Sequence, residues 1–317
     1  MKVVIISGPT ASGKTNTAIE LAKNFGGEVV NFDSLLLYKE ITIGTAKPTA
    51  FERKQIPHHM IDVTSINQPM NASDYEKAAF PVVEKLLKEK KNVYLTGGSG
   101  FYLQALLKGM YDSPTTSPEV IKRSEALYRA EGIKPFREIL RAHDPGSFER
   151  YHENDHYRTR RAVEHWWANG SRFSEQRSQK EESNLSLPSH SVHGWDVFHA
   201  YLNVPKEEHI RIIEKRTDHM LASGLIEEVR ALLDQGFTGL EKPLQSIGYK
   251  EALDYIFGVH KTQAECRDRI VISTRQLAKS QRTWFNRDHT KKIFHPIQDE
   301  KKIIESIGYF LNSTQPE

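Results

Sequence analysis

Gly8-Pro-Thr-Ala-Ser-Gly-Lys-Thr15 is the most informative segment near the N-terminus of this chain. It follows the short, β-branched apolar run 3–7, which predicts a buried parallel strand. It precedes residues 16–25, whose apolar positions fall on one face of a helix. A strand, a glycine-bounded loop, Gly-Lys-Thr and a helix in that order are typical of a phosphate-binding loop.

Each part of this loop suits an anion, because backbone N–H groups and the positive end of the helix dipole surround it. Lys14 adds a point charge, and the Thr15 hydroxyl can ligate Mg²⁺, the expected cofactor. The alternative is a glycine-rich turn that only caps a helix. The loop predicts a bound polyphosphate but does not tell cleavage from transfer or from use as a leaving group. The residues of the loop expected to surround the phosphates are Gly8, Pro9, Thr10, Ala11, Ser12, Gly13, Lys14 and Thr15.

Composition favours a globular cytoplasmic protein, since 38% of the 317 residues are hydrophobic and 27% are charged. No run approaches the ~18–20 apolar residues of a membrane span, and no signal peptide is expected before the first strand. The single cysteine, Cys266, excludes an internal disulfide and a multi-cysteine zinc site. A net charge of +3 is too small to indicate nucleic-acid binding by itself.

The N-terminal segment, up to about residue 112, alternates strands and helices, which predicts a parallel α/β sheet of the P-loop NTPase type. Further strands are expected at 28–32 and 91–96. A capping-box spacing, Ser73 to Glu76, opens a helix to about residue 90 that Pro81 should kink. Turns 8–15, 33–34 and 97–100 follow strand ends, so they should converge at one edge of the sheet.

Residues 113–194 have a different character, rich in arginine and helical in pattern, and are predicted to form an insertion domain. A strand at 195–203 then rejoins the core, which comprises 1–112 and 195–317. The C-terminal part is expected to be mostly helical, with helices at 206–222, 225–235, 246–257 and 261–286, a short strand at 293–296 and a last helix to about 311.

Two charged residues stand out as candidates for chemistry. Asp33 ends the second strand, where it could hold Mg²⁺, act as a base, or only cap a turn. Arg216 shares a helical face with Ile212, Ile213 and Met220, so it needs a carboxylate or a phosphate as its partner. A structural salt bridge to a buried acid is the alternative.

Basic residues gather in two further places. Arg275, Lys279 and Arg282 recur on one side of the helix at 261–286. Such a basic side is either an ordinary solvated surface or a contact with a phosphodiester backbone. The basic residues of the insertion favour the second interpretation. There, a second basic and aromatic cluster spans 157–161. His58 and His59 are expected to be structural, since no further metal ligand stands at a suitable spacing.

Taken together, the motifs resemble tRNA dimethylallyltransferases, also called tRNA isopentenyltransferases, of the bacterial type. The resemblance runs from residue 3 to about 287. It rests on residues 8–15, Asp33-Ser34, Tyr38-Lys39, Ile43-Gly-Thr-Ala-Lys-Pro48, Pro57-His-His59, Ile61-Asp62, Gly97-Gly98, Arg216, Ile247-Gly-Tyr249, Thr274-Arg-Gln-Leu-Ala-Lys279, Gln281 and Trp284.

This resemblance implies transfer of a dimethylallyl group from dimethylallyl diphosphate to N6 of the adenosine just 3′ of the tRNA anticodon, adenosine 37. The loop and Arg216 would bind the diphosphate, Asp33 would be the general base, and Ser99 would act near the bridging oxygen, where the family usually has Thr. A monomer is expected. By the same resemblance and the basic helix, tRNA contacts would come from Asp33, Ser34, Leu35, Leu36, Gln104, Tyr157, Arg158, Thr159, Arg160, Arg161, Gln245, Gly248, Arg275, Lys279 and Arg282.

The sequence departs from the family where Gln245 and Lys250 replace frequent arginines and Thr42 a frequent Asp. Other functions considered are a nucleotide kinase or ATPase, prenylation of free adenine nucleotides, and a non-catalytic RNA-binding module. The strand at 91–96 ends in Gly97-Gly98 without an acid, which counts against the kinase. The basic insertion and helix count against a free nucleotide as acceptor.

Overall fold

The computed structural model describes residues 1–109, 116–175 and 193–313. The chain divides into two compact units, Met1–Gly109 with Pro188–Glu317 and Met110–Leu187. The division expected at residues 112–113 falls outside the described residues. Within the described ranges, no helix combines the length and the apolarity that crossing a bilayer requires.

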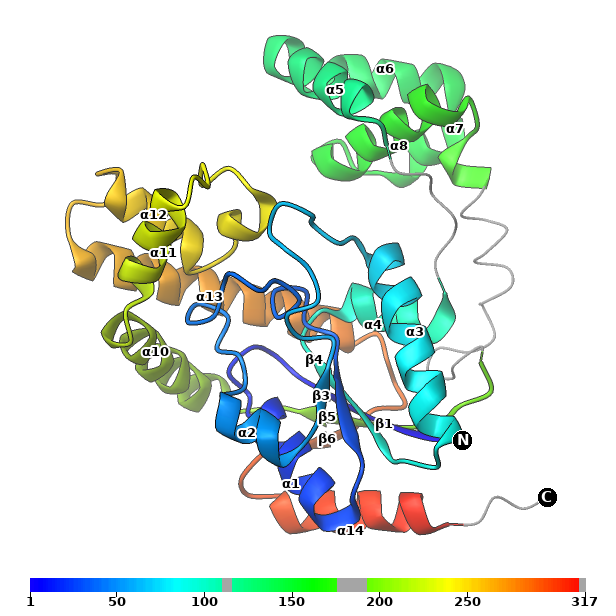
Figure 1. The fold of residues 1–317 in the computed structure, drawn as a ribbon. Helices are drawn as coiled ribbons and strands as arrows, with labels where there is room; N and C mark the ends of the chain where they lie inside the picture. Colours follow the sequence, from blue (N-terminus) through cyan, green and yellow to red (C-terminus); the bar gives the residue numbers. More distant parts are fainter. Residues whose placement is uncertain (110–115, 176–192, 314–317) are drawn as a thin grey trace. The chain divides into compact units, whose positions relative to one another are not determined.

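A six-stranded sheet forms the centre of the first unit, with the strand order β3-β2-β4-β1-β5-β6 (Figure 1). Every neighbouring pair is parallel, and the strand after the insertion pairs with the first strand. The predicted parallel α/β sheet is therefore confirmed. The strands are β1 (Lys2–Ser7), β2 (Glu28–Asn31), β3 (His58–His59), β4 (Val93–Gly97), β5 (Asp196–Leu202) and β6 (Lys292–Phe294).

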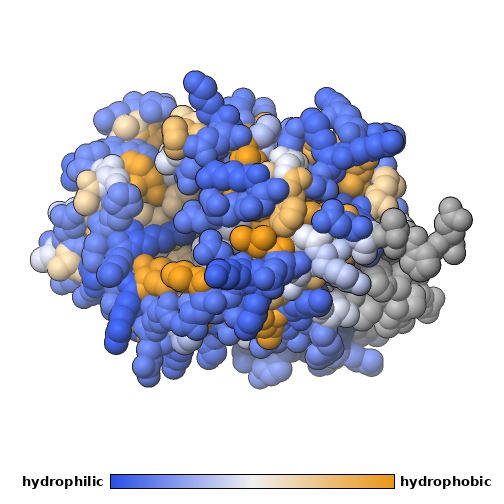
Figure 2. Space-filling model, turned by 90° about the horizontal axis from the view of Figure 1, so that it is seen from below, coloured by the Kyte–Doolittle hydropathy of each residue, from blue (hydrophilic) through white to orange (hydrophobic). Residues whose placement is uncertain are grey.

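Alternate residues of β1 build two cores, because successive side chains of a strand point to opposite faces. Val3 and Ile5 pack with α3 (Ala72–Lys88) and α4 (Gly100–Lys108). Val4 and Ile6 pack with α1 (Lys14–Phe25) and α14 (Glu300–Asn312). Seen from the side on which α14 lies, the surface is mostly hydrophilic, with separate hydrophobic patches (Figure 2).

A helical layer follows β5 in the same unit and has its own core, in which Tyr249 and Leu225 are fully buried. It confirms the expected helical C-terminal part. Its elements and the short helix before β3 are α2 (Ala50–Gln55), α10 (Lys206–Ala222), α11 (Leu225–Asp234), the 3₁₀ helix η1 (Lys242–Gln245), α12 (Tyr249–Ile256) and α13 (Gln263–Phe285).

Two helix starts differ from the sequence expectation. Helix α3 is capped by Asn71, whose side chain accepts from the amide of Asp74, and not by Ser73. The helix continues through Pro81. The helix expected at 246–257 begins only at Tyr249, because Gly248 before it takes a φ of 93°, outside the helical region.

The second unit consists of helices around a small core that includes Phe136, Leu140 and Val163. The helices that the structure describes in it are α5 (Pro118–Glu131), α6 (Lys134–His143), α7 (Pro145–Arg150) and α8 (His156–Asn169). Its helical character agrees with the pattern in the sequence.

Candidate active site

The turns after β2 and β4 lie against each other, as expected for the carboxyl ends of adjacent parallel strands. The Ser99 hydroxyl accepts a hydrogen bond from the Ser34 amide at 3.1 Å. A Cβ on Gly97 would come within 2.8 Å of the Asp33 amide, so only glycine allows this approach. Asp33 and Ser99, predicted to share a site, are thus brought together.

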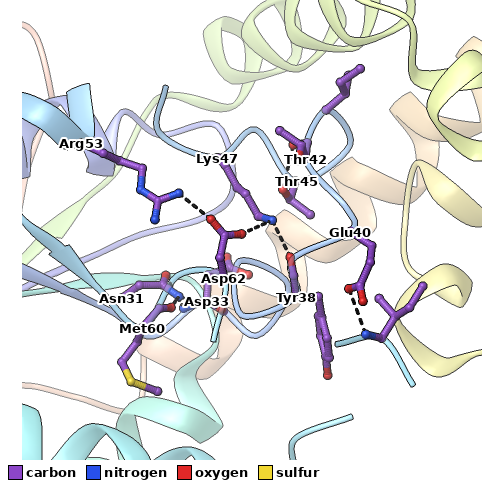
Figure 3. A network of polar contacts seen from close by, with 12 residues as sticks. Asn31, Asp33, Tyr38, Glu40, Thr42, Thr45, Lys47, Arg53, Met60 and Asp62 are labelled. Carbon is purple, nitrogen blue, oxygen red and sulfur yellow. Dashed lines mark hydrogen bonds and ion pairs between the residues drawn. The ribbon is translucent and has the colours of Figure 1, made fainter. Parts of the chain in front are cut away.

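Asp33 is held by the side chain of the buried Asn31. The side-chain oxygen of Asn31 accepts from the backbone amide of Asp33 at 2.8 Å, and the side-chain nitrogen of Asn31 donates to the backbone carbonyl of Met60 at 2.8 Å (Figure 3). One Asp33 carboxylate oxygen accepts from the Leu35 amide at 3.2 Å. This turn leaves the second carboxylate oxygen without a hydrogen bond from the described residues.

A further ion cluster fixes the loop between β2 and β3. The Asp62 carboxylate forms ion pairs with Lys47 at 2.7 Å and with Arg53 at 2.5 Å, and Lys47 also donates to the carbonyl of Tyr38 (Figure 3). Burial favours the neutral acid, but the hydrogen bonds from Lys47 and Arg53 hold the pKa of Asp62 below its usual value. The motif residues Lys47 and Asp62 therefore support the site rather than line it.

Lys14 begins α1, and its ammonium group donates to the carbonyls of Gly8 at 3.1 Å and Pro9 at 2.8 Å. Burial lowers the pKa of Lys14 to about 8, the nearby Asp33 carboxylate opposes this shift, and the Arg216 guanidinium adds to it. Lys14, Arg216 and Asp33 are therefore close enough to influence one another's charge.

Arg216 projects from α10 toward the same place. Burial lowers its pKa, and Asp33 is the charge that opposes the shift. In the part of the chain that the structure describes, its guanidinium forms neither an ion pair nor a hydrogen bond, so the alternative of a structural salt bridge finds no support. Two half-buried cations without a bound carboxylate form a site for an anion.

The phosphate loop itself supplies one more unused polar group. The Ser12 hydroxyl is buried and has no hydrogen-bond partner within the described residues. A Cβ on Gly8 would lie 2.6 Å from it, so this glycine keeps the hydroxyl close to the loop backbone. The sequence predicts that the Thr10 amide binds the anion. In the structure this amide instead donates to the side-chain oxygen of Gln281 at 2.7 Å.

Of the three basic residues expected along one side of α13, Arg275 and Lys279 are exposed. They line a groove of about 740 Å³ between α10 and α13, together with Lys206 and Arg282. Arg282 differs, because it turns toward α10 and donates to His209 at 2.7 Å and to the carbonyl of Val204 at 3.2 Å. Arg282 is therefore half-buried and hydrogen-bonded internally, and its contact with tRNA stays a prediction.

The basic cluster of α8, residues 157–161, is also only partly available for contact with RNA. Thr159 is fully buried, so its predicted contact with RNA is wrong for this structure. Arg160 and Arg161 pair with the buried Glu164, at 3.9 Å and 2.8 Å, because that carboxylate needs cationic partners inside the unit.

Tyr157 and Arg158, at the start of α8, are exposed. Tyr157 is 71% exposed, while Arg158 pairs with the capping residue Asp155 at 2.5 Å. Of the remaining candidates, Gln104 and Gln245 are exposed, Leu35 and Leu36 are half-buried, and Gly248 is buried.

Two residues in contact with the loop were not proposed as site residues from the sequence, His209 and Gln281. His209 donates to the carbonyl of Thr10 at 2.8 Å. Its spacing of seven residues from Arg216, on the same face of α10, is a signal that could have identified it. Gln281 belongs to the motif on α13, but only the fold shows that its side chain reaches the loop.

Comparison with known proteins identifies relatives over most of the chain. The family model described as IPP transferase matches residues 36–288. A protein named tRNA dimethylallyltransferase 1 from Citrifermentans bemidjiense is 38% identical over 292 residues, which cover 91% of this chain and 90% of that protein. One named tRNA dimethylallyltransferase 2 from Geotalea uraniireducens is 37% identical and covers 91% and 90%.

Solved structures agree with this result. The tRNA isopentenylpyrophosphate transferase from Bacillus halodurans matches with a TM-score of 0.69 and 29% identity, over 98% of this chain and 95% of that one. A eukaryotic dimethylallyltransferase acting on tRNA, 24% identical, shares the fold with a TM-score of 0.79 over 100% of this chain and 81% of its own. The chain therefore belongs to the IPP transferase family, whose curated relatives matched here are named tRNA dimethylallyltransferases.

Proposed function

We propose that this protein transfers the dimethylallyl group of dimethylallyl diphosphate to N6 of adenosine 37, immediately 3′ of the tRNA anticodon. The observation that carries this proposal is the arrangement of Lys14, Arg216 and Asp33. Two cations that form no ion pair among the described residues lie near one carboxylate, at a phosphate-binding loop. Such a site suits an anionic leaving group on one side and a proton acceptor on the other.

The diphosphate of the donor is bound by the loop 8–15 and Arg216. Amides of the loop and the start of α1 provide N–H donors and a positive dipole end. Lys14 and Arg216 neutralise the charge that develops as the allylic C–O bond breaks, and the Ser12 hydroxyl adds a donor. Stabilisation of developing charge by preorganised groups is usually the largest catalytic contribution.

Mg²⁺ fits this site as a cofactor held mainly by the diphosphate. Thr15 offers a hydroxyl and Asp33 a carboxylate, the oxygen ligands that Mg²⁺ prefers. Among the described residues, no group of three or more His, Cys, Asp or Glu side chains could hold a metal ion alone. Thr15 would therefore be the main protein ligand, and the bound ion would supply further neutralisation of the leaving group.

Asp33 acts as the general base toward the adenine. As N6 forms its bond to the allylic carbon, the bond from that carbon to the bridging oxygen breaks, and the diphosphate departs with the electron pair. The amine proton passes to the Asp33 carboxylate. Ser99 donates to the bridging oxygen once the diphosphate is bound, in place of its 3.3 Å hydrogen bond to the Ser34 hydroxyl, while its own oxygen keeps accepting from the Ser34 amide.

The tRNA presents its adenine by base flipping, since N6 in a stacked loop cannot reach the donor. Arg275 and Lys279 contact backbone phosphates, and Tyr157 and Arg158 contribute from the second unit. Gln104 and Gln245 are exposed and remain proposed contacts. The enzyme acts as a monomer in the cytoplasm, where its tRNA substrate is found.

The test is incubation of the purified protein with Mg²⁺, labelled dimethylallyl diphosphate and either unmodified tRNA or AMP. Label is expected in tRNA at the adenosine next to the anticodon and absent from AMP. Label in AMP alone would indicate an enzyme for free nucleotides. ATP hydrolysis without prenyl transfer would instead identify a phosphoryl-transfer enzyme and overturn the proposal.

A further inference from the structure

The peptide of Thr10, in the phosphate loop, is held from both sides by distant side chains. Its amide donates to Oε1 of Gln281 at 2.7 Å, and its carbonyl accepts from Nε2 of His209 at 2.8 Å. Gln281 lies on α13 and His209 on α10, 271 and 199 residues further along the chain. Both backbone polar groups of one loop residue are thus satisfied by the C-terminal helical layer.

The tautomer of His209 is fixed by its other neighbour. Nη2 of Arg282 lies 2.7 Å from Nδ1 of His209, and a guanidinium can only donate, so Nδ1 must accept. The proton of a neutral imidazole then lies on Nε2, directed at Thr10. Burial lowers the pKa of His209, the hydrogen bond to Thr10 opposes this, and Arg282 and Lys14 lower it further, which favours the neutral form.

Gln281 extends the same support to the second turn of the site. Its Nε2 donates to the carbonyl of Gly98 at 3.0 Å, while its Oε1 binds Thr10. A Cβ on Gly98 would lie 2.4 Å from that nitrogen, so glycine is required for this hydrogen bond. One amide therefore joins the phosphate loop to the turn that carries Ser99.

The loop needs such support because of its backbone conformation. Ala11, directly after Thr10, has a φ of 61°, in the left-handed region that an alanine rarely adopts. A residue held there is strained and persists only where its surroundings fix it. The hydrogen bonds to both sides of Thr10 are adjacent to this strained residue.

We propose that His209 and Gln281 are positioning residues that fix the Thr10 peptide and thereby preorganise the loop for the diphosphate leaving group. Arg282 serves the same purpose by orienting His209. The inference rests on the proposed function. Neither residue touches the reacting atoms. A loop already held in its binding conformation loses less entropy on binding and keeps its donors aligned as charge develops.

The experiment measures inorganic diphosphate binding by calorimetry with Mg²⁺, together with the KM for each substrate. His209→Ala and Gln281→Met are each expected to weaken diphosphate binding by roughly tenfold, the equivalent of removing one or two hydrogen bonds. The KM for dimethylallyl diphosphate rises in parallel, while the KM for tRNA stays the same. His209→Gln, whose amide can donate from the position of Nε2, restores most of the affinity. His219→Ala changes an exposed histidine of the same helix and serves as the matched control.

The outcomes separate this inference from the proposed function. Wild-type protein that transfers the prenyl group, with both variants binding diphosphate normally, would overturn the positioning role alone. A raised KM for tRNA with unchanged diphosphate binding would also overturn it, since the residues would then serve the RNA surface. Wild-type protein without affinity for diphosphate would overturn both. If His209→Ala fails to fold, His209→Gln and Gln281→Met still test the inference. A His209→Gln protein that binds diphosphate much more weakly than wild type would contradict the role of His209 as a hydrogen-bond donor.

Discussion

Asn31 holds both polar groups of the Asp33 backbone with one side chain. Its oxygen accepts from the Asp33 amide at 2.8 Å, and its nitrogen donates to the Asp33 carbonyl at 3.0 Å. Asn31 is itself 1% exposed and ends β2, so it is anchored in the sheet. The position of the proposed base therefore depends on a buried side chain that never meets substrate.

Asn31→Ala is expected to destabilise the fold and to slow the reaction. The change leaves the buried carbonyl of Met60 and the amide of Asp33 without partners, which costs about 3 kcal/mol. The kcat should fall because the carboxylate loses its orientation, while diphosphate affinity stays near the wild-type value. Denaturant unfolding and steady-state kinetics measure the two effects.

Asn92→Ala is the matched control for this variant. Asn92 also donates to a backbone carbonyl, that of Phe25 at 2.8 Å, but it precedes β4 at the opposite end of the strand from Gly97. It should lose stability without losing kcat. Equal losses of kcat in both variants would mean that the activity follows global stability rather than the orientation of Asp33.

Asp33→Asn is expected to abolish turnover while keeping diphosphate binding. The amide oxygen can still accept from the Leu35 amide, so the turn survives, but the proton acceptor is gone. Loss of a general base lowers kcat by ~10²–10⁴-fold. Calorimetry with Mg²⁺ and diphosphate is the second measurement, and loss of binding there would show that Asp33 holds the metal ion. Asp234→Asn, at an exposed carboxylate of α11, is the control.

Lys14→Met should raise the melting temperature of the protein at pH 7. Burial lowers the pKa of Lys14 to about 8, Arg216 contributes to the shift, and Asp33 only partly opposes it, so the charged form is disfavoured in the fold. Removing the charge removes this cost. The same variant should lose the increase in melting temperature that diphosphate gives the wild type, since the bound anion stabilises only a protein that can bind it.

The pH dependence of stability tests the same group. Between the folded pKa of about 8 and the unfolded value of 10.5, the unfolded state binds more protons at Lys14. The contribution of Lys14 to stability therefore rises with pH across this window. The difference in unfolding free energy between Lys14→Met and wild type should shrink from pH 8 to pH 10.5. A constant difference would contradict a lowered pKa.

The sheet could be predicted from the sequence because local signals were sufficient for it. The apolar run 3–7, the glycine-bounded loop and the Gly97-Gly98 turn each specify their own backbone conformation. The start of α3 could not be predicted from the sequence, because a capping-box spacing occurs twice, at Asn71 with Asp74 and at Ser73 with Glu76. The burial of Ala72 and Tyr75 decides between them, and burial depends on tertiary packing.

The placement of Lys14, Asp33 and Arg216 near one another could also be predicted, since charges at a phosphate loop or on an apolar helix face require partners. The inward orientation of Arg282 could not be predicted, because the helical period places this residue beside Arg275 and Lys279 on α13. Only the packing of α10 against α13 brings His209 within 2.7 Å and turns Arg282 inward. Sequence spacing shows which residues share a helix face, but not what the neighbouring helix offers them.

This difference among the three basic residues predicts how tRNA binding responds to salt. Arg275→Ala combined with Lys279→Ala removes two exposed cations, so the slope of log affinity against log salt should fall by roughly 1.5, because each neutralised phosphate contributes about 0.7–0.9 to that slope. Arg282→Ala should leave the slope nearly unchanged and weaken diphosphate binding instead, because its hydrogen bonds are internal. Lys301→Ala with Lys302→Ala, on the exposed face of α14, controls for net charge. A slope that falls equally in the control would assign the effect to overall charge rather than to the groove between α10 and α13.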